Sequence, residues 1–219
     1  MIVQIYEVSE PREAKQLAEA GVDHIGVLVG KGAYPREIPY AQAKAVFASL
    51  PSGASSVALT LSRDPEEILA LVDSTGPDIL HIGTLPEHFP PQKVASLKGQ
   101  LPGTKIMRSI PVRGEEAVSL AQRFAPTADW LLLDSFAAGD TQIGATGEVH
   151  NWSLSRRIVQ ALEIPVVLAG GLGPDNVARA IAEVRPDGVD SKTKTDRPGT
   201  HRKDLKRVQE FVRAARSCF

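Results

Sequence analysis

The stretch "PVVLAGGLGPDNV", residues 165–177, joins an apolar, β-branched run to a pair of glycines and then to the start of a helix. Pro174 and Asp175 favour the first turn of a helix over 173–184. The glycines Gly170 and Gly171 let the backbone turn tightly between the two elements. A strand, a short turn and a helix in this order form the repeating unit of alternating α/β folds.

The same unit recurs along the chain. Short apolar runs predict eight strands, at 2–5, 24–29, 56–61, 78–83, 105–110, 130–134, 165–170 and 187–190. Helical spacing or helix-start signals lie between them, most clearly at 10–21, 64–73, 173–184 and 201–216. Eight strands, most of them followed by a helix, predict a single (β/α)8 TIM barrel.

The rival architecture is an open, doubly wound parallel sheet. That fold predicts a glycine-rich fingerprint directly after the first strand, and the residues after 2–5 contain none. No stretch reads as a linker or a low-complexity segment. We therefore expect one TIM-barrel domain over residues 1–219.

Composition excludes several classes of function. Of 219 residues, 42% are hydrophobic and 23% charged, and the formal net charge is -1. This balance is that of a soluble globular protein and favours neither nucleic acid nor an anionic membrane as a partner. The chain has one cysteine, Cys218, so no disulfide forms within it. The N-terminal residues lack the features of a signal peptide, and we expect a cytoplasmic protein.

In TIM barrels the chemistry lies at the C-terminal ends of the strands. At these ends, or in the loops that follow them, the sequence has seven polar residues with suitable chemistry: Tyr6, Glu7, Arg36, His81, Arg108, Asp134 and Asp190. The five histidines show no metal-ligand spacing, so we predict neither a metal nor a cofactor.

The glycine turns predict a phosphate site. Backbone N–H groups at Gly170 and Gly171 can approach an anion closely, and a helix N-terminus follows them. The loop after 187–190 supplies Lys192, Thr193 and Lys194, and Gly147 lies in a glycine-rich loop after the strand at 130–134. The loops after strands 7 and 8 often bind phosphate in this fold. The alternative is that these glycines only make tight turns.

These motifs resemble the phosphoribosylanthranilate isomerase family of tryptophan biosynthesis. The family's "(S/A)GGLxPxNV" is matched almost letter for letter by residues 169–177. Its strand-6 aspartate, GGTG loop and "(F/H)DW" are echoed by Asp134, residues 144–147 and Asn151-Trp152. Weaker echoes are Tyr34-Pro35-Arg36 for "SPR", Val189-Asp190 for "VDVSSG", and residues 198–204 for "PGxKD".

The resemblance implies an Amadori rearrangement, in which an N-linked phosphoribosylamine becomes a 1-deoxyribulose phosphate. Such an enzyme is an intramolecular oxidoreductase of the aldose–ketose isomerase type. By resemblance Asp134 is the general acid for the ring oxygen and Arg36 binds the anthranilate carboxylate. His81, Arg108 and Asp190 are expected to contact the substrate. The alternatives without a catalytic role are that Asp134 only caps a loop and that Arg36 is only a solvated charge in its loop.

The chain departs from the family at the tip of the first strand. The family opens "KICGIT", with a cysteine as general base, whereas this chain has Tyr6 at that place and Glu7 after it. A tyrosine near its reference pKa of about 10 is a poor base at neutral pH. Glu7 is a better one, but strand alternation predicts that it points away from the direction of Tyr6. Tyr6 and Glu7 both remain candidate catalytic residues.

Three functions stay open at this point. The first is a true isomerase with a substituted base. The second is a paralogous isomerase or lyase for another phosphorylated sugar, with Lys192 or Lys194 as charge clamp or Schiff-base amine. The third is a non-catalytic barrel that binds a phosphorylated metabolite. In each case the expected ligand is a small phosphorylated sugar, and the protein is expected to be a monomer or a homodimer.

Overall fold

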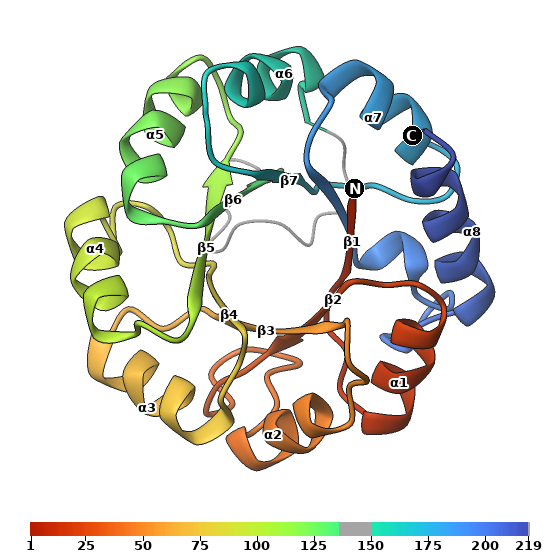
Figure 1. The fold of residues 1–219 in the computed structure, drawn as a ribbon, viewed down its shortest axis with the longest axis horizontal. Helices are drawn as coiled ribbons and strands as arrows, with labels where there is room; N and C mark the ends of the chain where they lie inside the picture. Colours follow the sequence, from red (N-terminus) through yellow and green to blue (C-terminus); the bar gives the residue numbers. More distant parts are fainter. Residues whose placement is uncertain (136–149, 219) are drawn as a thin grey trace.

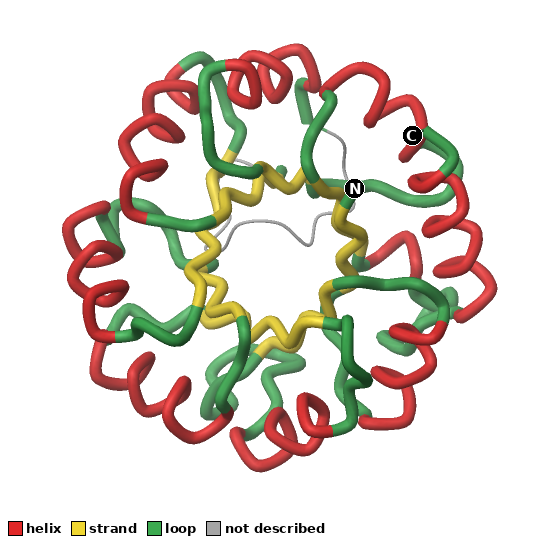
Figure 2. The backbone as a smooth tube through the Cα atoms, in the orientation of Figure 1, coloured by secondary structure: helices red, strands yellow, loops and turns green. Residues whose placement is uncertain are grey.

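The computed structural model describes residues 1–135 and 150–218. Its eight strands form one closed parallel barrel in the order β1 to β8, which confirms the TIM-barrel prediction over the doubly wound sheet. Figure 1 shows the strands as the inner ring and the helices as the outer ring, and Figure 2 shows the alternation of the two element types around the ring. The described residues contain no helix that is long and apolar enough to cross a membrane.

The strands have the bounds β1 (Ile2–Ile5), β2 (His24–Leu28), β3 (Ser55–Thr60), β4 (Ile79–Ile82), β5 (Lys105–Pro111), β6 (Trp130–Asp134), β7 (Val166–Leu168) and β8 (Gly188–Ser191). The α-helices are α1 (Pro11–Glu19), α2 (Tyr40–Ala48), α3 (Pro65–Thr75), α4 (Pro91–Gln100), α5 (Glu116–Phe124), α6 (Trp152–Gln160), α7 (Val177–Val184) and α8 (Leu205–Arg216). Two short 3-10 helices lie at Ala125–Thr127 (η1) and Thr193–Thr195 (η2).

In α3, α6 and α8 a side chain at the N-cap accepts from the free N–H groups of the first turn. The Asp64 side chain accepts from Glu66 N and begins α3, and the Asp204 side chain does the same for α8. Two helices start later than the sequence suggested. The residues before α7 form a turn in which Asn176 Oδ1 accepts from Gly173 N at 2.8 Å, and α8 begins only after its cap at Asp204.

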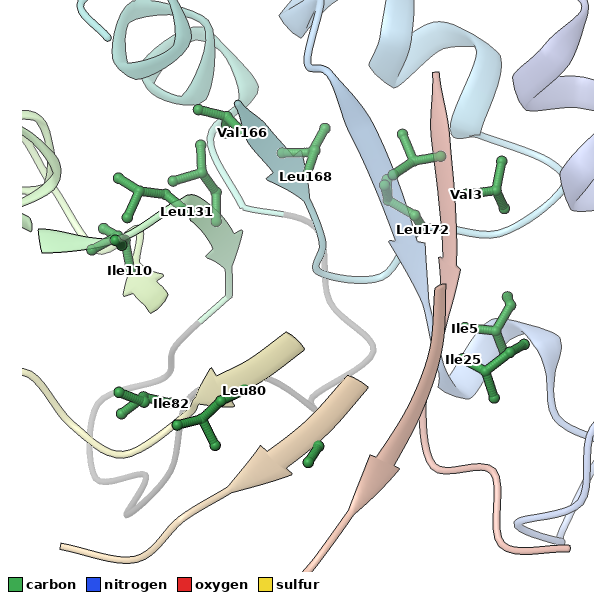
Figure 3. Packing of buried hydrophobic residues seen from close by; sticks show 14 of the residues in the cluster. Val3, Ile5, Ile25, Leu80, Ile82, Ile110, Leu131, Val166, Leu168 and Leu172 are labelled. Atoms are coloured by element: carbon green, nitrogen blue, oxygen red, sulfur yellow. The ribbon is translucent and has the colours of Figure 1, made fainter. Parts of the chain in front are cut away.

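The hydrophobic core has two parts. The larger part fills the layer between strands and helices and contains the residues labelled in Figure 3, such as Ile5, Leu80 and Leu168. The smaller part fills the inside of the barrel and contains Val57, Met107, Leu132, Val167 and their neighbours. Along β3 to β7, hydrophobic side chains alternate between the two parts. The inner part of the core therefore lies beneath any cavity at the C-terminal ends of the strands.

Candidate active site

A solvent-open cavity of about 740 Å³ lies at the C-terminal ends of the strands. Leucines from β2, β3 and β6 make up much of its apolar wall. Its polar lining brings together six of the predicted site residues: Tyr6, Glu7, Arg36, His81, Asp134 and Asp190. Lys192, predicted to bind phosphate, lines it as well.

A second hollow of about 310 Å³ adjoins the cavity and shares three lining residues with it: Asp134, Asp190 and Lys192. Its remaining walls are Gly170, Gly171 and Leu172 after β7, Ser191 at the end of β8, and Thr193 and Lys194 after β8. All the predicted phosphate residues except one meet here, and Gly147 lies outside the described residues. We call this hollow the glycine cleft.

Glycine is required at position 170 by both conformation and space. Gly170 has φ 84°, in the region that L side chains rarely adopt. A Cβ atom there would lie 2.8 Å from His150 Nδ1 and 3.3 Å from Asp134 Oδ1. Gly171 has φ 63°. The turn after β7 therefore keeps its backbone close to the acid at the end of β6.

Asp134 stands where the cavity and the glycine cleft meet. Burial raises the pKa of its carboxyl to about 7, although Ser135 N donates to Oδ1 at 2.7 Å and favours the charged form. Part of the residue remains open to the cavity. A carboxyl group with this pKa can hold a proton at neutral pH and give it up, as a general acid must.

Asp190 on β8 is a second acid with a raised pKa. The main cause is burial, and the charge of Asp134 adds to it. Gln4 Nε2 donates to Asp190 Oδ1 at 3.2 Å, and His24 Nδ1 lies 3.1 Å from Gln4 Oε1. The sequence analysis missed Gln4. The one feature of the sequence that could have indicated Gln4 is that it is a polar residue inside an apolar strand.

Tyr6, His81 and Ser109 form a hydrogen-bonded chain across the barrel mouth. The Tyr6 hydroxyl is bonded to His81 Nδ1, and His81 Nε2 lies 2.7 Å from Ser109 Oγ. Burial raises the pKa of Tyr6 well above 10 and lowers that of His81 to about 3. Both groups are neutral at pH 7, so the phenol can donate to Nδ1 while Nε2–H donates to Ser109. A tyrosine in this state is not a base.

The prediction that Glu7 points away from the direction of Tyr6 is wrong, because both side chains line the cavity. Strand β1 ends at Ile5, and Glu7 has φ 61°, so the alternation of a regular strand does not extend to it. Glu7 Oε2 lies 2.8 Å from Arg36 Nη1 and 3.2 Å from Lys192 Nζ. The side chain of Glu7 is 9% exposed, and its carboxylate lies between two cations.

The charges continue from Lys192 into the loop after β8. Lys192 Nζ lies 3.7 Å from Asp196 Oδ2, and Lys203 Nζ lies 2.6 Å from Asp196 Oδ1. Lys203 also donates to the carbonyl oxygen of Lys192 at 3.1 Å. The Lys203 side chain is 1% exposed. Its buried ammonium group helps to fix the position of Lys192. Sequence reasoning did not find Asp196, and Lys203 appeared there only as part of a motif.

Arg36 is placed by the loop between β2 and α2. The Glu37 side chain accepts from three successive backbone N–H groups, those of Gly32, Ala33 and Tyr34, at 2.8–3.3 Å. Ile38 N donates to Leu28 O at 2.9 Å and ties the end of the loop back to β2. Arg36 itself has φ 74°. The loop thus holds Arg36 over the cavity in an uncommon backbone conformation.

Arg108 does not line the cavity, contrary to its predicted substrate contact. Its neighbours Met107 and Ser109 face into the barrel, so Arg108 faces the helix layer. There it is fully buried, donates to Ile82 O at 2.7 Å, and lies with Cζ 4.8 Å from the centre of the Phe124 ring. Among residues 1–135 and 150–218, no group of three or more His, Cys, Asp or Glu side chains could hold a metal ion.

A family model described as "N-(5'phosphoribosyl)anthranilate (PRA) isomerase" matches residues 3–214. The chain belongs to this family. It is 33% identical over 214 residues to the N-(5'-phosphoribosyl)anthranilate isomerase of Methanocella arvoryzae, covering 98% of this chain and 97% of the relative. It is 34% identical over 214 residues to the enzyme of that name from Pseudomonas fluorescens, covering 97% and 94%.

Solved structures from the family share the fold over the whole barrel. The N-(5'-phosphoribosyl)anthranilate isomerase of Pyrococcus furiosus superposes with a TM-score of 0.80 at 26% identity, covering 99% of each chain. The phosphoribosyl anthranilate isomerase of Thermococcus kodakaraensis gives 0.78 at 25% identity, covering 98% of each chain. Membership of the family confirms the resemblance drawn from the glycine motif at 169–177.

Proposed function

We propose that this chain catalyses the Amadori rearrangement of N-(5'-phosphoribosyl)anthranilate, an intramolecular aldose–ketose isomerisation. Family membership supports the reaction class. The substrate is a small phosphorylated sugar derivative with an aromatic amine, and it is supported by the apolar wall of the cavity and by the predicted phosphate residues that line the adjoining glycine cleft.

The observation that carries the proposal is the place of Asp134. Its carboxyl lies between the cavity and the glycine cleft and has a pKa raised to about 7. A substrate with its aromatic ring in the cavity and its phosphate at Gly170 and Gly171 would bring the ribose over this acid. Asp134 then protonates the ring oxygen while the C1–O bond breaks and the amine nitrogen forms the C=N bond.

The second step needs a base that removes the proton from C2 of the sugar. The electron pair of that C–H bond forms the C1=C2 double bond of an enolamine, whose tautomerisation gives the ketone. We assign the proton acceptor to Glu7 rather than Tyr6, because the phenol of Tyr6 is neutral and bonded to His81. Glu7 offers a carboxylate in the same cavity. Two carboxyl groups with different surroundings commonly divide acid and base roles in this way.

Incubation of the purified protein with N-(5'-phosphoribosyl)anthranilate tests the proposal. We expect conversion to the 1-deoxyribulose phosphate, and rescue of an isomerase-deficient tryptophan auxotroph by the gene. Glu7→Gln is expected to lower kcat about 10²–10⁴-fold, the usual contribution of a general base, whereas Tyr6→Phe retains most of it. No turnover and no rescue by a folded wild-type protein would contradict the proposal.

A second candidate is a paralogous isomerase acting on a different phosphorylated amine. The observation that favours it is the engagement of Arg36 by Glu7, since this cation is then already paired before any substrate carboxylate arrives. Binding of phosphoribosylanthranilate without turnover would favour this candidate.

A further inference from the structure

Three side chains form a charged end of the cavity, which we call the carboxylate clamp: Glu7, Arg36 and Lys192. One oxygen of Glu7 contacts both cations, at 2.8 Å to Arg36 Nη1 and 3.2 Å to Lys192 Nζ. The side chains of Arg36 and Lys192 are 24% and 13% exposed, so water screens this cluster less than it would a surface pair.

The backbone of Glu7 is in the left-handed region, at φ 61°. A non-glycine residue in this region is strained and persists only where its surroundings enforce it. A regular continuation of β1 would turn the side chain away from Tyr6. The uncommon conformation instead delivers the carboxylate to the two cations.

The clamp retains unused capacity for an anion. Together with Asp196 and Lys203, the cluster has three cations and two carboxylates, so one positive charge is unmatched. Arg36 Nε is buried and has no hydrogen-bond partner among the described residues. A guanidinium N–H that has no partner can donate to a further carboxylate oxygen.

From these contacts we infer that Glu7 is an internal carboxylate that occupies the Arg36–Lys192 pair in the free protein and competes there with the carboxylate of the ligand. Glu7 is then a specificity-determining residue. It lowers the affinity for aromatic carboxylates and leaves the affinity for the uncharged aromatic ring unchanged. The inference rests on the proposed function for the place of the aromatic ring, and it extends that function by naming the residue that limits the affinity for a carboxylate.

The test is a titration with two small probes, anthranilate and aniline, which differ in the carboxylate. Glu7→Gln keeps the shape of the side chain and removes its charge. Because hydrogen bonds to charged groups are about twice as strong as neutral ones, we expect Glu7→Gln to bind anthranilate about tenfold or more tightly than wild type. Its affinity for aniline should stay within twofold. The double variant Glu7→Gln/Arg36→Leu should lose the gain.

Glu10→Gln is the matched control. Glu10 also pairs with an arginine, Arg202 at 3.4 Å, but this pair is exposed and neither residue lines the cavity. Its affinity for both probes should equal that of wild type. Thermal melts identify any variant that fails to fold. In that case Glu7→Asp, which shortens the side chain, replaces Glu7→Gln with the same expected direction.

Unchanged or weaker binding of anthranilate by folded Glu7→Gln would overturn the inference, as would an equal gain for aniline. Failure of anthranilate to bind any variant would overturn it too. These readouts need no turnover. Loss of the proposed function would appear as an inactive wild type that still discriminates between the two probes after Glu7→Gln, so the two failures are distinguishable.

Discussion

Glu7 and Arg36 are ion-paired at 2.8 Å, and both have a left-handed backbone conformation, at φ 61° and 74°. Arg185, a C-cap of α7, is the one other non-glycine residue with positive φ in the described part of the chain. Two strained residues from separate loops thus meet in one contact at the barrel mouth. Strain of this kind clusters at functional sites, where the rest of the fold holds it in place.

Asp134→Asn should abolish turnover and leave the affinity for a phosphorylated ligand nearly intact. The asparagine cannot protonate the ring oxygen, and loss of a general acid costs about 10²–10⁴-fold in rate. In the wild type, kcat/KM should fall as the pH rises through about 7, where the carboxyl loses its proton. Steady-state kinetics from pH 5.5 to 8.5 checks both points. Equal losses in binding and rate would indicate a structural acid instead.

The same substitution should change how stability depends on pH. The pKa of Asp134 rises from 3.8 to about 7 on folding, so the favourable protonated state is fully present below pH 4 and is lost as the pH rises through 7. Asp134→Asn removes this dependence. Its stability relative to wild type should therefore be higher at pH 8 than at pH 4, by up to about 4 kcal/mol. Urea unfolding of both proteins at the two pH values measures the difference.

Gly170→Ala should weaken both stability and phosphate binding. The new Cβ would meet His150 and Asp134, and alanine at φ 84° is strained. We expect a loss of about 2 kcal/mol or more in the free energy of unfolding. Gly99→Ala is the matched control, because a Cβ at this position in α4 meets open space. It should be neutral or stabilise by up to about 1 kcal/mol.

Glu37→Gln should loosen the loop that carries Arg36. The charge on Glu37 strengthens its bonds to the three backbone N–H groups of residues 32–34. We expect KM for a carboxylated substrate to rise about threefold to tenfold, with kcat within twofold of wild type. Glu19→Gln, which removes an exposed pair with Lys15, should leave both constants unchanged. A fall in kcat alone would contradict a positioning role.

Arg108→Met should leave KM unchanged, since Arg108 faces the helix layer. Its Nε and Nη2 are buried without hydrogen-bond partners among the described residues. Replacing a buried, incompletely bonded cation by an apolar side chain of similar volume is often neutral or stabilising. Thermal melts and steady-state kinetics check this. A large rise in KM would restore the substrate contact that the sequence suggested.

The fold could be predicted because its signal is local. Each apolar run, glycine turn and helix cap acts within a few residues, as the stretch 165–177 illustrates. The ends of the strands also located the acid Asp134 and the glycine cleft. Side-chain direction was less predictable. Arg108 was placed at the mouth because it lies near the end of its strand, but it alternates with Met107 and Ser109, which face into the barrel, and therefore points outward.

The partners of the site residues depend on strand register, which a single sequence does not reveal. Gln4 reaches Asp190 because β1 pairs with β8, with Gln4 opposite Asp190. The pairing of Glu7 with Arg36 depends on two positive φ values at residues that are not glycine, and no sequence rule predicts those.

Closure of the barrel has a consequence for the order of assembly during synthesis. Strand β1 pairs with β8. Residues 2–5 therefore cannot form these backbone hydrogen bonds until residues 188–191 have been synthesised. Contacts that join distant parts of a chain form late, because the loop between them must close first. Glu7 and Lys192 therefore come together only after the residues between them have left the ribosome. A nascent chain that lacks β8 should not retain the ligand, and binding can serve as a readout of completed folding.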